Sequence, residues 1–218
     1  MYRLSYRSSF ARRGIPVFML LLVTGCASPP KAPEAPAPAK TPAQQRIDAW
    51  QELVREQTDA RTEQKLEQVN RFFNHLEFVD DASHWGREDY WATPEETLIS
   101  NGGDCEDFTI AKYFTLKQLA LPEQQMRLIY VKSLTLNQPH MVLGYYAHPQ
   151  ADPLLLDNLI DAIVPAAQRP DLVPVYSFNS EGLWLAKQGG QGELVGDADQ
   201  LGLWQDLLGR IQASASGP

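Results

Sequence analysis

The sequence has few cysteines, no excess of positive charge and no long apolar run beyond its first segment, and each absence excludes a class of protein. Two cysteines among 218 residues exclude a disulfide-rich scaffold and a zinc site built from several cysteines. A formal charge of −8 argues against nucleic acid as a partner, because binding a polyanion needs a basic surface. The chain also lacks an internal repeat, a phosphate-binding glycine loop and a serine-nucleophile elbow.

What is present fits one globular domain with appendages. The hydrophobic fraction of 44% is too high for a disordered chain, and 218 residues are too few for two full domains.

The first 26 residues have the pattern of a bacterial lipoprotein signal peptide. They begin with a basic region that contains Arg3, Arg7, Arg12 and Arg13. The apolar run 15–23 follows and is too short to span a bilayer as a stable helix. It leads into Thr24-Gly25-Cys26, which resembles the lipobox, whose cysteine is lipidated and becomes the new N-terminus. A plain secretory signal with a chance cysteine is the alternative interpretation.

Lipidation of Cys26 would anchor the chain to a membrane on the periplasmic side. Ala27 and Ser28 lack the aspartate that retains many lipoproteins at the inner membrane, which favours the outer membrane. Residues 27–42 are rich in Ala, Pro and Lys and predict an extended tether. Removal of residues 1–25 leaves 15 basic and 27 acidic residues, so the mature chain is predicted to be acidic, with a charge of about −12.

Residues 43–212 have the patterns of a folded domain with both helices and strands. Helices are expected over 43–76, with a break or bend at the polar stretch 57–63, and over 107–119 and 201–211. Strands are expected over 126–132, 140–147, 154–156, 174–178 and 182–185, the last two as a hairpin. Loops are expected over 80–95, where Pro94 marks a helix start, and over 189–196.

Cys105 is the cysteine that keeps its thiol if Cys26 is lipidated. It lies in the polar stretch Asn-Gly-Gly-Asp-Cys-Glu-Asp, directly before a predicted helix, and a helix N-terminus lowers the pKa of a thiol. The neighbouring Asp104, Glu106 and Asp107 act in the opposite direction, unless a bound cation neutralises them or Asp107 caps the helix. Cys105 is therefore a candidate nucleophile, and burial as a small apolar residue is the alternative.

A thiol nucleophile needs an imidazole that accepts its proton and a further group that orients the imidazole. His140 opens a predicted strand, and Asp157 follows another strand 17 residues later, so both side chains can face one side of a sheet edge. Cys105, His140 and Asp157 are thus a workable triad. The alternative is that His140 is a hydrogen-bonded edge residue without a catalytic role.

Five segments together resemble a known family. They are WATPEETLISNGGDCEDFTIAKY (91–113), PHMVL (139–143), LDNL (156–159), RPDLVPVYSFN (169–179) and GLWL (182–185). In combination they resemble the bacterial transglutaminase-like cysteine proteases of the LapG type, and the resemblance extends from about residue 70 to residue 185.

The resemblance implies an α+β, papain-like or transglutaminase-type core, in which a cysteine helix packs on an antiparallel sheet. It implies that Cys105 is the nucleophile, that His140 is the general base and then the general acid, and that Asp157 orients the imidazole. The family is calcium-dependent, and the acids that flank its cysteine match Asp104 and Glu106 as Ca²⁺ ligands.

The resemblance also implies a substrate and a regulator. Members of the family cut the N-terminal region of large surface adhesins beside a pair of alanines and so release cells from a biofilm. A cyclic-di-GMP receptor in the inner membrane inhibits them. Typical members are soluble, so the lipobox is a departure, and an extended 16-residue tether, which reaches only about 50 Å, would limit access to that receptor. The alternatives are acyl transfer to an amine, as in transglutaminases, and a catalytically inactive lipoprotein that binds a partner.

Overall fold

The computed structural model describes residues 39–186 and 192–215, and every structural statement below concerns these residues. The signal peptide predicted over 1–26 and most of the predicted tether, residues 27–38, lie outside the described residues. Within the described part, no helix combines the length and the apolar character needed to cross a bilayer. The domain boundaries at residues 26 and 42 therefore stay predictions.

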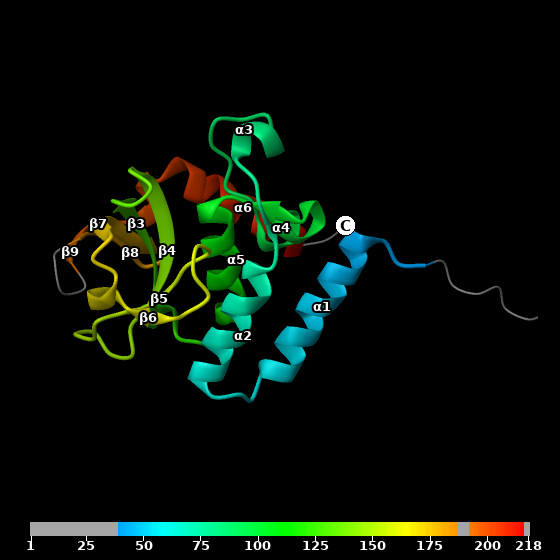
Figure 1. The fold of residues 1–218 in the computed structure, drawn as a ribbon, viewed down its shortest axis with the longest axis horizontal. Coiled ribbons are helices and arrows are strands. Elements are labelled where there is room, and N and C mark those ends of the chain that lie inside the picture. The colour runs from blue at the N-terminus through cyan, green and yellow to red at the C-terminus, as the bar shows by residue number, and fades with distance from the viewer. Residues whose placement is uncertain (1–38, 187–191, 216–218) are drawn as a thin grey trace, which may run out of the picture. The chain divides into compact units, whose positions relative to one another are not determined.

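A seven-stranded antiparallel sheet forms one layer of the described domain (Figure 1). Its strands are β3 (Met126–Ser133), β4 (Gln138–Tyr145), β5 (Leu154–Leu156), β6 (Val164–Pro165), β7 (Leu172–Asn179), β8 (Gly182–Leu185) and β9 (Glu193–Gly196). They are arranged in the order β6-β5-β4-β3-β7-β8-β9. The two central strands, β3 and β4, pair over their full lengths, from Met126 opposite Tyr145 to Ser133 opposite Gln138.

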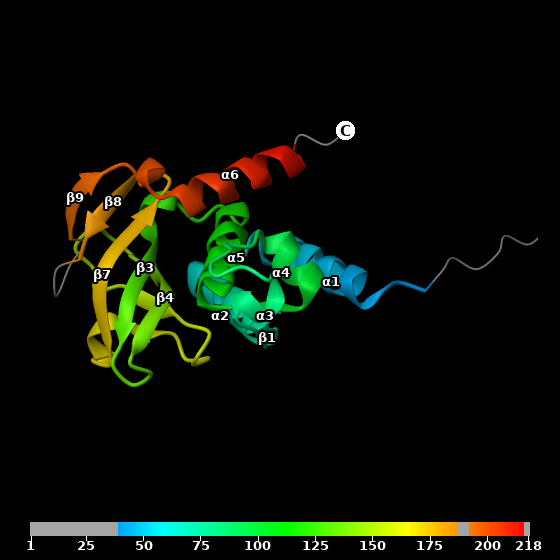
Figure 2. The same ribbon diagram turned by 90° about the horizontal axis from the view of Figure 1, so that it is seen from above.

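The helices lie to one side of this sheet in both ribbon views (Figures 1 and 2). They are α1 (Pro42–Gln57), α2 (Thr62–Asn74), α3 (Asp81–His84), α4 (Pro94–Ser100), α5 (Cys105–Gln118) and α6 (Gly202–Ala215). A short parallel pair, β1 (Glu77–Phe78) and β2 (Gly102–Gly103), connects the end of α2 to the entrance of α5.

Helix α5 is the central element because its side chains are buried on several faces. It contacts β3 and β4 of the sheet as well as α2 and α4. The fully buried residues include Ile110, Ala111, Tyr113 and Leu116. A helix that is apolar around its circumference is typical of the interior of a domain. The first turn of α5 is therefore held at a fixed place beside the sheet.

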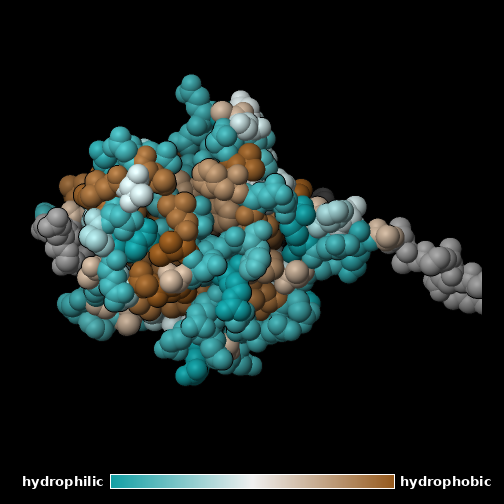
Figure 3. All heavy atoms as spheres, in the orientation of Figure 1, coloured by the Kyte–Doolittle hydropathy of each residue, from teal (hydrophilic) through white to brown (hydrophobic). Residues whose placement is uncertain are grey.

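The exposed surface is divided between helices and sheet. In the space-filling view, α1 and α2 present a mainly hydrophilic surface, whereas apolar residues gather over the strands (Figure 3). A second apolar cluster, separate from the main core, is formed by Ile129, Val131, Val142, Leu155 and Leu172.

The α+β architecture with the cysteine helix on an antiparallel sheet is confirmed. The predicted break in the first helical segment is also present, because α1 ends at Gln57 and α2 begins at Thr62. The loop predicted over 80–95 is wrong in part, since Asp81–His84 form α3, with Asp80 accepting from the amide of Ser83 as its cap.

The loop predicted over 189–196 is also wrong in part. Residues 189–191 lie outside the described residues, but Glu193–Gly196 form β9 by pairing with β8. This strand is short and exposed, so it carries no alternation of apolar and polar residues. Its strand conformation comes from hydrogen bonds to a neighbour that the local sequence does not specify.

The C-terminal helix is attached through one large aromatic side chain. Trp204 of α6 is 1% exposed, and its ring centroid lies 5.3 Å from that of Phe178, 5.8 Å from Phe114 and 5.9 Å from Tyr113. These partners belong to β7 and α5, so Trp204 joins three elements that are far apart in the sequence.

We expect Trp204→Ala to lower the free energy of unfolding by about 3–5 kcal/mol, because it leaves a cavity between α6, α5 and β7. Gln205→Ala, which changes the next and exposed residue, should cost less than about 0.5 kcal/mol. Urea unfolding followed by circular dichroism measures both. Equal stability of the two variants would contradict the proposed attachment.

Candidate active site

The two glycines before Cys105, Gly102 and Gly103, let the backbone pass close to neighbouring atoms, and this determines where α5 begins. A Cβ atom on Gly103 would lie 2.2 Å from Oδ2 of Asp107, and one on Gly102 would lie 2.3 Å from the carbonyl oxygen of Glu77. Glycine at both positions therefore lets the chain enter the helix between its own first turn and β1. Oδ2 of Asp107 accepts a hydrogen bond from the amide of Asp104 at 3.3 Å, which caps the helix.

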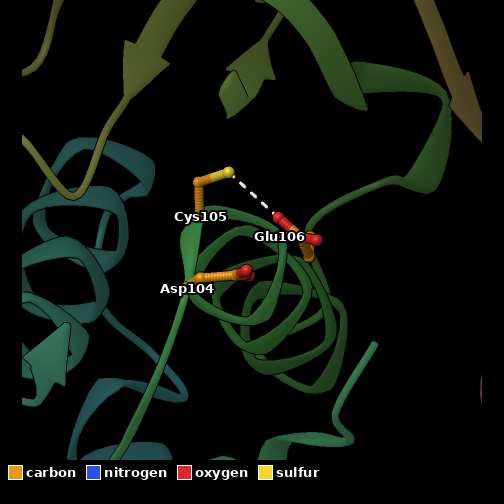
Figure 4. Close-up of side chains that lie close together, drawn as sticks. All are labelled: Asp104, Cys105 and Glu106. Atoms are coloured by element: carbon orange, nitrogen blue, oxygen red, sulfur yellow. Dashed lines mark hydrogen bonds between the residues drawn. The ribbon is translucent and has the colours of Figure 1, made fainter. Parts of the chain in front are cut away.

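Cys105 lies at the N-terminus of α5, as predicted, although the helix begins at Cys105 itself and not at residue 107. The amides of a first helical turn have no partner within the helix and point outward from its end. Figure 4 shows that the sulfur of Cys105 points from the helix end toward the strands, with Asp104 and Glu106 on the same turn. Sγ also receives a hydrogen bond from the backbone of Met141, the residue after His140.

The structure brings His140 and Asp157 together. Nε2 of His140 lies 2.8 Å from Oδ1 of Asp157, and the two residues are 3% and 1% exposed. The same oxygen accepts a hydrogen bond from the amide of Leu159 at 3.0 Å. Because Nε2 is engaged with the carboxylate, Nδ1 is the ring nitrogen that remains for proton exchange with a thiol.

Cys105 and His140 line one cavity of about 820 Å³. Its wall includes four aromatic residues, Phe78, Trp91, Tyr130 and Tyr176, and the rings of the two tyrosines are stacked with centroids 4.9 Å apart. A cavity of this size is large enough to hold several residues of a peptide. The candidate site is therefore a cleft between the start of α5, the start of β4 and the middle of β7.

A residue that the sequence reasoning missed, Arg169, holds the other oxygen of Asp157. Its Nη1 lies 2.8 Å from Oδ2 of Asp157. Burial acts to raise the pKa of Asp157, but the hydrogen bond and charge of His140, the amide of Leu159 and Arg169 outweigh burial and hold that pKa at about 2. Asp157 is therefore ionised throughout the neutral range, as a group that orients an imidazole must be.

The thiol of Cys105 is in an environment that opposes its ionisation. Sγ lies 2.9 Å from Oε2 of Glu106 and donates to it. Burial, then the charge and hydrogen bond of Glu106, and then the charge of Asp104 raise the pKa of the Cys105 thiol above its ordinary value of 9.0, although the Met141 backbone acts to lower it. The predicted effect of the flanking acids is thus present, and it prevails over the helix end.

The two predicted metal ligands, Asp104 and Glu106, lie in a larger group of acids. Three overlapping sets of side chains, each with its ligand atoms within 4.8 Å of one another, are Asp104-Cys105-Glu106, Asp81-Asp104-Asp107 and Asp81-Asp89-Glu106. Sequence reasoning missed Asp81 and Asp89, because they come from the 80–95 segment that only the fold brings beside α5. The run of acids within that segment was the available signal.

Two observations indicate that this group fits a hard cation. Oδ1 of Asp81 and Oδ1 of Asp104 are buried and have no hydrogen-bond partner among the described residues. Burial, followed by the charge of Glu106, raises the pKa of Asp104 to about 10, and burial raises the pKa of Asp81 to about 6. Carboxylates crowded in this way need a positive charge, and a set of oxygen ligands is the preference of Ca²⁺.

Comparison with known proteins identifies a family and similar solved structures. The family model described as bacterial transglutaminase-like cysteine proteinase BTLCP matches residues 40–187. The solved structure of EGTA-treated LapG from Legionella pneumophila is 45% identical, covers 79% of this chain and 91% of its own, and superposes with a TM-score of 0.73. The calcium-bound form of LapG is 44% identical, covers 79% and 93%, and gives a TM-score of 0.71. A comparison with curated proteins finds no match.

The raised pKa values in the acidic group predict how the stability of the calcium-free protein changes with pH. The pKa of Asp104 is about 10 in the folded chain and ordinarily 3.8, so folding favours its protonated form, and stability is lost as the pH rises above about 4. We therefore expect Asp104→Asn to stabilise the chelator-treated protein by about 1–2 kcal/mol at pH 8 and to have little effect at pH 4.

Asp59→Asn is the matched control, because Asp59 is exposed and lies outside the acidic group. It should leave stability unchanged at both pH values. Urea unfolding in EGTA measures the three proteins. A destabilised Asp104→Asn variant at pH 8 would contradict the assignment of a repulsive acidic group.

Proposed function

The chain belongs to the bacterial transglutaminase-like cysteine proteinases, and on this basis we propose that it is a calcium-dependent periplasmic cysteine endopeptidase. The observation that carries the proposal is the 2.8 Å hydrogen bond between His140 and Asp157, at a cleft that also contains Cys105. Nucleophile, base and orienting acid are the three parts that a thiol protease needs.

In the proposed reaction, Nδ1 of His140 takes the proton of the Cys105 thiol, and the sulfur attacks the carbonyl carbon of a peptide bond. His140 then gives this proton to the departing amine, the C–N bond breaks, and a thioester remains on Cys105. Water attacks the thioester with His140 as the base, which releases the new carboxylate and restores the thiol. Asp157 orients the imidazole and stabilises its positive charge.

The oxyanion that forms during each attack needs a hydrogen-bond donor. The backbone N–H of Cys105 is the donor we propose, because it belongs to the first turn of α5 and lies beside the attacking sulfur. The partial positive charge at the start of the helix favours the same negative charge.

We propose that Asp104 and Glu106 hold Ca²⁺ together with Asp81 and Asp89. Support comes from the unpartnered carboxylate oxygens of Asp81 and Asp104 and from the calcium-bound and EGTA-treated forms of LapG. A bound calcium ion supplies positive charge that offsets the carboxylates beside the thiol. The roles of His140 and Met141 are the same with calcium bound: His140 accepts the proton of the thiol, and the backbone of Met141 donates a hydrogen bond to the sulfur.

The substrate we propose is the N-terminal region of a large surface adhesin, cut beside a pair of alanines, with release of cells from a biofilm as the result. The partner we propose as an inhibitor is an inner-membrane receptor for cyclic di-GMP. Both come from the family resemblance of the sequence. Lipidation of Cys26 is proposed from the lipobox pattern at residues 23–26, and outer-membrane attachment from the absence of an aspartate at Ala27 and Ser28.

We expect Cys105→Ala to abolish cleavage of a purified N-terminal adhesin fragment while the protein keeps its fold, because the variant has no nucleophile. Gel electrophoresis and mass spectrometry of the fragment measure the result. Shortened peptides favour hydrolysis, whereas isopeptide-linked products would favour acyl transfer to an amine. Cleavage that persists in Cys105→Ala would rule out the mechanism.

The matched control changes the other cysteine of the chain. Cys26→Ala should leave cleavage by the purified protein unchanged, because Cys26 takes no part in the proposed reaction. In cells, the same variant should move from the membrane fraction to the soluble periplasmic fraction if Cys26 is lipidated.

We expect calcium at 100 times its dissociation constant to stabilise the protein by about 2.7 kcal/mol, and EGTA to abolish cleavage. At one fixed calcium concentration, the stabilisation should be larger at pH 8 than at pH 5, because protons compete with calcium: the carboxyl of Asp81 binds a proton below a pKa of about 6, and that of Asp104 below a pKa of about 10. Glu106→Gln should weaken calcium binding at least tenfold. The control Glu95→Gln, an exposed acid on α4, should bind like the wild type in isothermal titration calorimetry.

A further inference from the structure

Arg169 lies behind the His140–Asp157 pair and is bound on both sides by carboxylates. Its Nη1 lies 2.8 Å from Oδ2 of Asp157. Its Nε lies 3.0 Å from Oδ1 of Asp171, and its Nη2 lies 2.8 Å from Oδ2 of the same residue. The whole residue is 9% exposed. The guanidinium is therefore held in one plane by a two-point contact with Asp171, and its remaining edge faces Asp157.

The two carboxylate oxygens of Asp157 accept hydrogen bonds from different partners. Oδ1 serves the imidazole of His140 and the amide of Leu159, and Oδ2 serves Arg169. If the bond to Oδ2 were lost, the carboxylate would be held at Oδ1 alone, by the amide of Leu159 and the imidazole, and it could turn about that oxygen so that the hydrogen bond to Nε2 is no longer in line. Charge alone would not prevent this rotation, but a directed hydrogen bond from a rigid guanidinium does.

Other groups near Asp157 do not replace this contact. Lys112 of α5 is 1% exposed and acts on Asp157 and Asp161 through its charge, while its burial lowers its pKa to about 7. Nδ2 of Asn74, from α2, donates to the backbone carbonyl of Asp157 at 3.0 Å rather than to its carboxylate. Among the described residues, Arg169 is thus the side chain that is hydrogen-bonded to Oδ2.

We propose that Arg169 is a positioning residue of the proteolytic reaction: held by Asp171, its guanidinium fixes the Asp157 carboxylate against Nε2 of His140. The imidazole is then restricted to the tautomer and orientation that leave Nδ1 for the thiol of Cys105. The inference rests on the proposed function, because it assigns a task within the same catalytic set. Arg169 is not proposed to contact the substrate.

The test uses p-nitrophenyl acetate, which acylates a reactive thiol and releases p-nitrophenolate. We expect Arg169→Met to slow acylation of Cys105 in saturating calcium about 100-fold, because a displaced base costs about that factor. Arg169→Lys keeps the charge but loses the planar fork, and it should recover only part of the rate, to about 10-fold below the wild type. Long-range ¹H–¹⁵N spectra of the histidine rings should lose the Nε2–H tautomer of His140 in Arg169→Met.

Arg46→Met is the matched control. Arg46 also donates from its guanidinium to two acceptors, the carbonyls of Leu98 and Ile99, but it lies on α1 and does not line the active-site cavity. It should acylate within twofold of the wild type. If Arg46→Met and Arg169→Met slow acylation equally, the effect is general destabilisation and the proposal is wrong.

The remaining outcomes separate this inference from the proposed function. A folded Arg169→Met with the wild-type rate and the wild-type His140 spectrum overturns the positioning role alone. If Arg169→Met does not fold, the positioning role is tested with Asp171→Asn, which loosens the guanidinium without changing Asp157. This variant should slow acylation about 3- to 10-fold at an unchanged melting temperature. A wild-type rate in Asp171→Asn overturns the positioning role. A wild-type protein in which Cys105 does not react overturns the proposed function itself.

Discussion

The placement of a thiol among carboxylates is the constraint on which the rest of the site depends. Cys105 is half-buried, donates to Glu106 and follows Asp104 in sequence, and its desolvation and these acids raise the pKa of its thiol. A nucleophilic sulfur must be ionised, and the start of α5 alone does not overcome these acids. In the proposed mechanism the site therefore needs positive charge from two sources: a cation among the acids and an imidazolium that forms on His140 when it takes the proton of the thiol.

The carboxylates beside His140 and those beside Cys105 have pKa values shifted in opposite directions. Asp157 is ionised because His140, Arg169 and an amide offset the cost of its burial. Asp81 and Asp104 are buried beside other acids, with one unpartnered oxygen each, and their pKa values are raised. The first arrangement is complete in the protein itself, whereas the second is complete only with a bound cation. In the proposed mechanism, catalysis is thus tied to calcium at the nucleophile and is independent of it at the base.

Sequence reasoning was most successful where chemistry and local pattern agree. The Gly-Asp-Cys stretch placed Cys105 at a helix start because glycine and aspartate are the residues that permit and cap such a turn. The strand patterns placed His140 at the start of one strand and Asp157 after another. These strands, β4 and β5, are antiparallel neighbours within the sheet, and the two side chains form a hydrogen bond at their common end rather than at a sheet edge. Sequence reasoning missed the role of Arg169, although this residue opens the segment 169–179 that carries the family resemblance, because the segment does not show which carboxylate the guanidinium binds. It also missed Asp81, because the run of acids in 80–95 does not show which of them lie beside α5.

The sequence by itself determined the position of the cysteine helix and the residue types available for catalysis, because helix caps and apolar periodicity act over a few residues. The fold class followed from the resemblance of its motifs to a known family. Only the tertiary structure decided which charges meet: Arg169 with Asp157, and Asp81 and Asp89 with Glu106. The physical reason is that an ion pair depends on distance in space, and the packing of α5 against β4, with the turn of the chain through α3, sets those distances without leaving a period in the sequence.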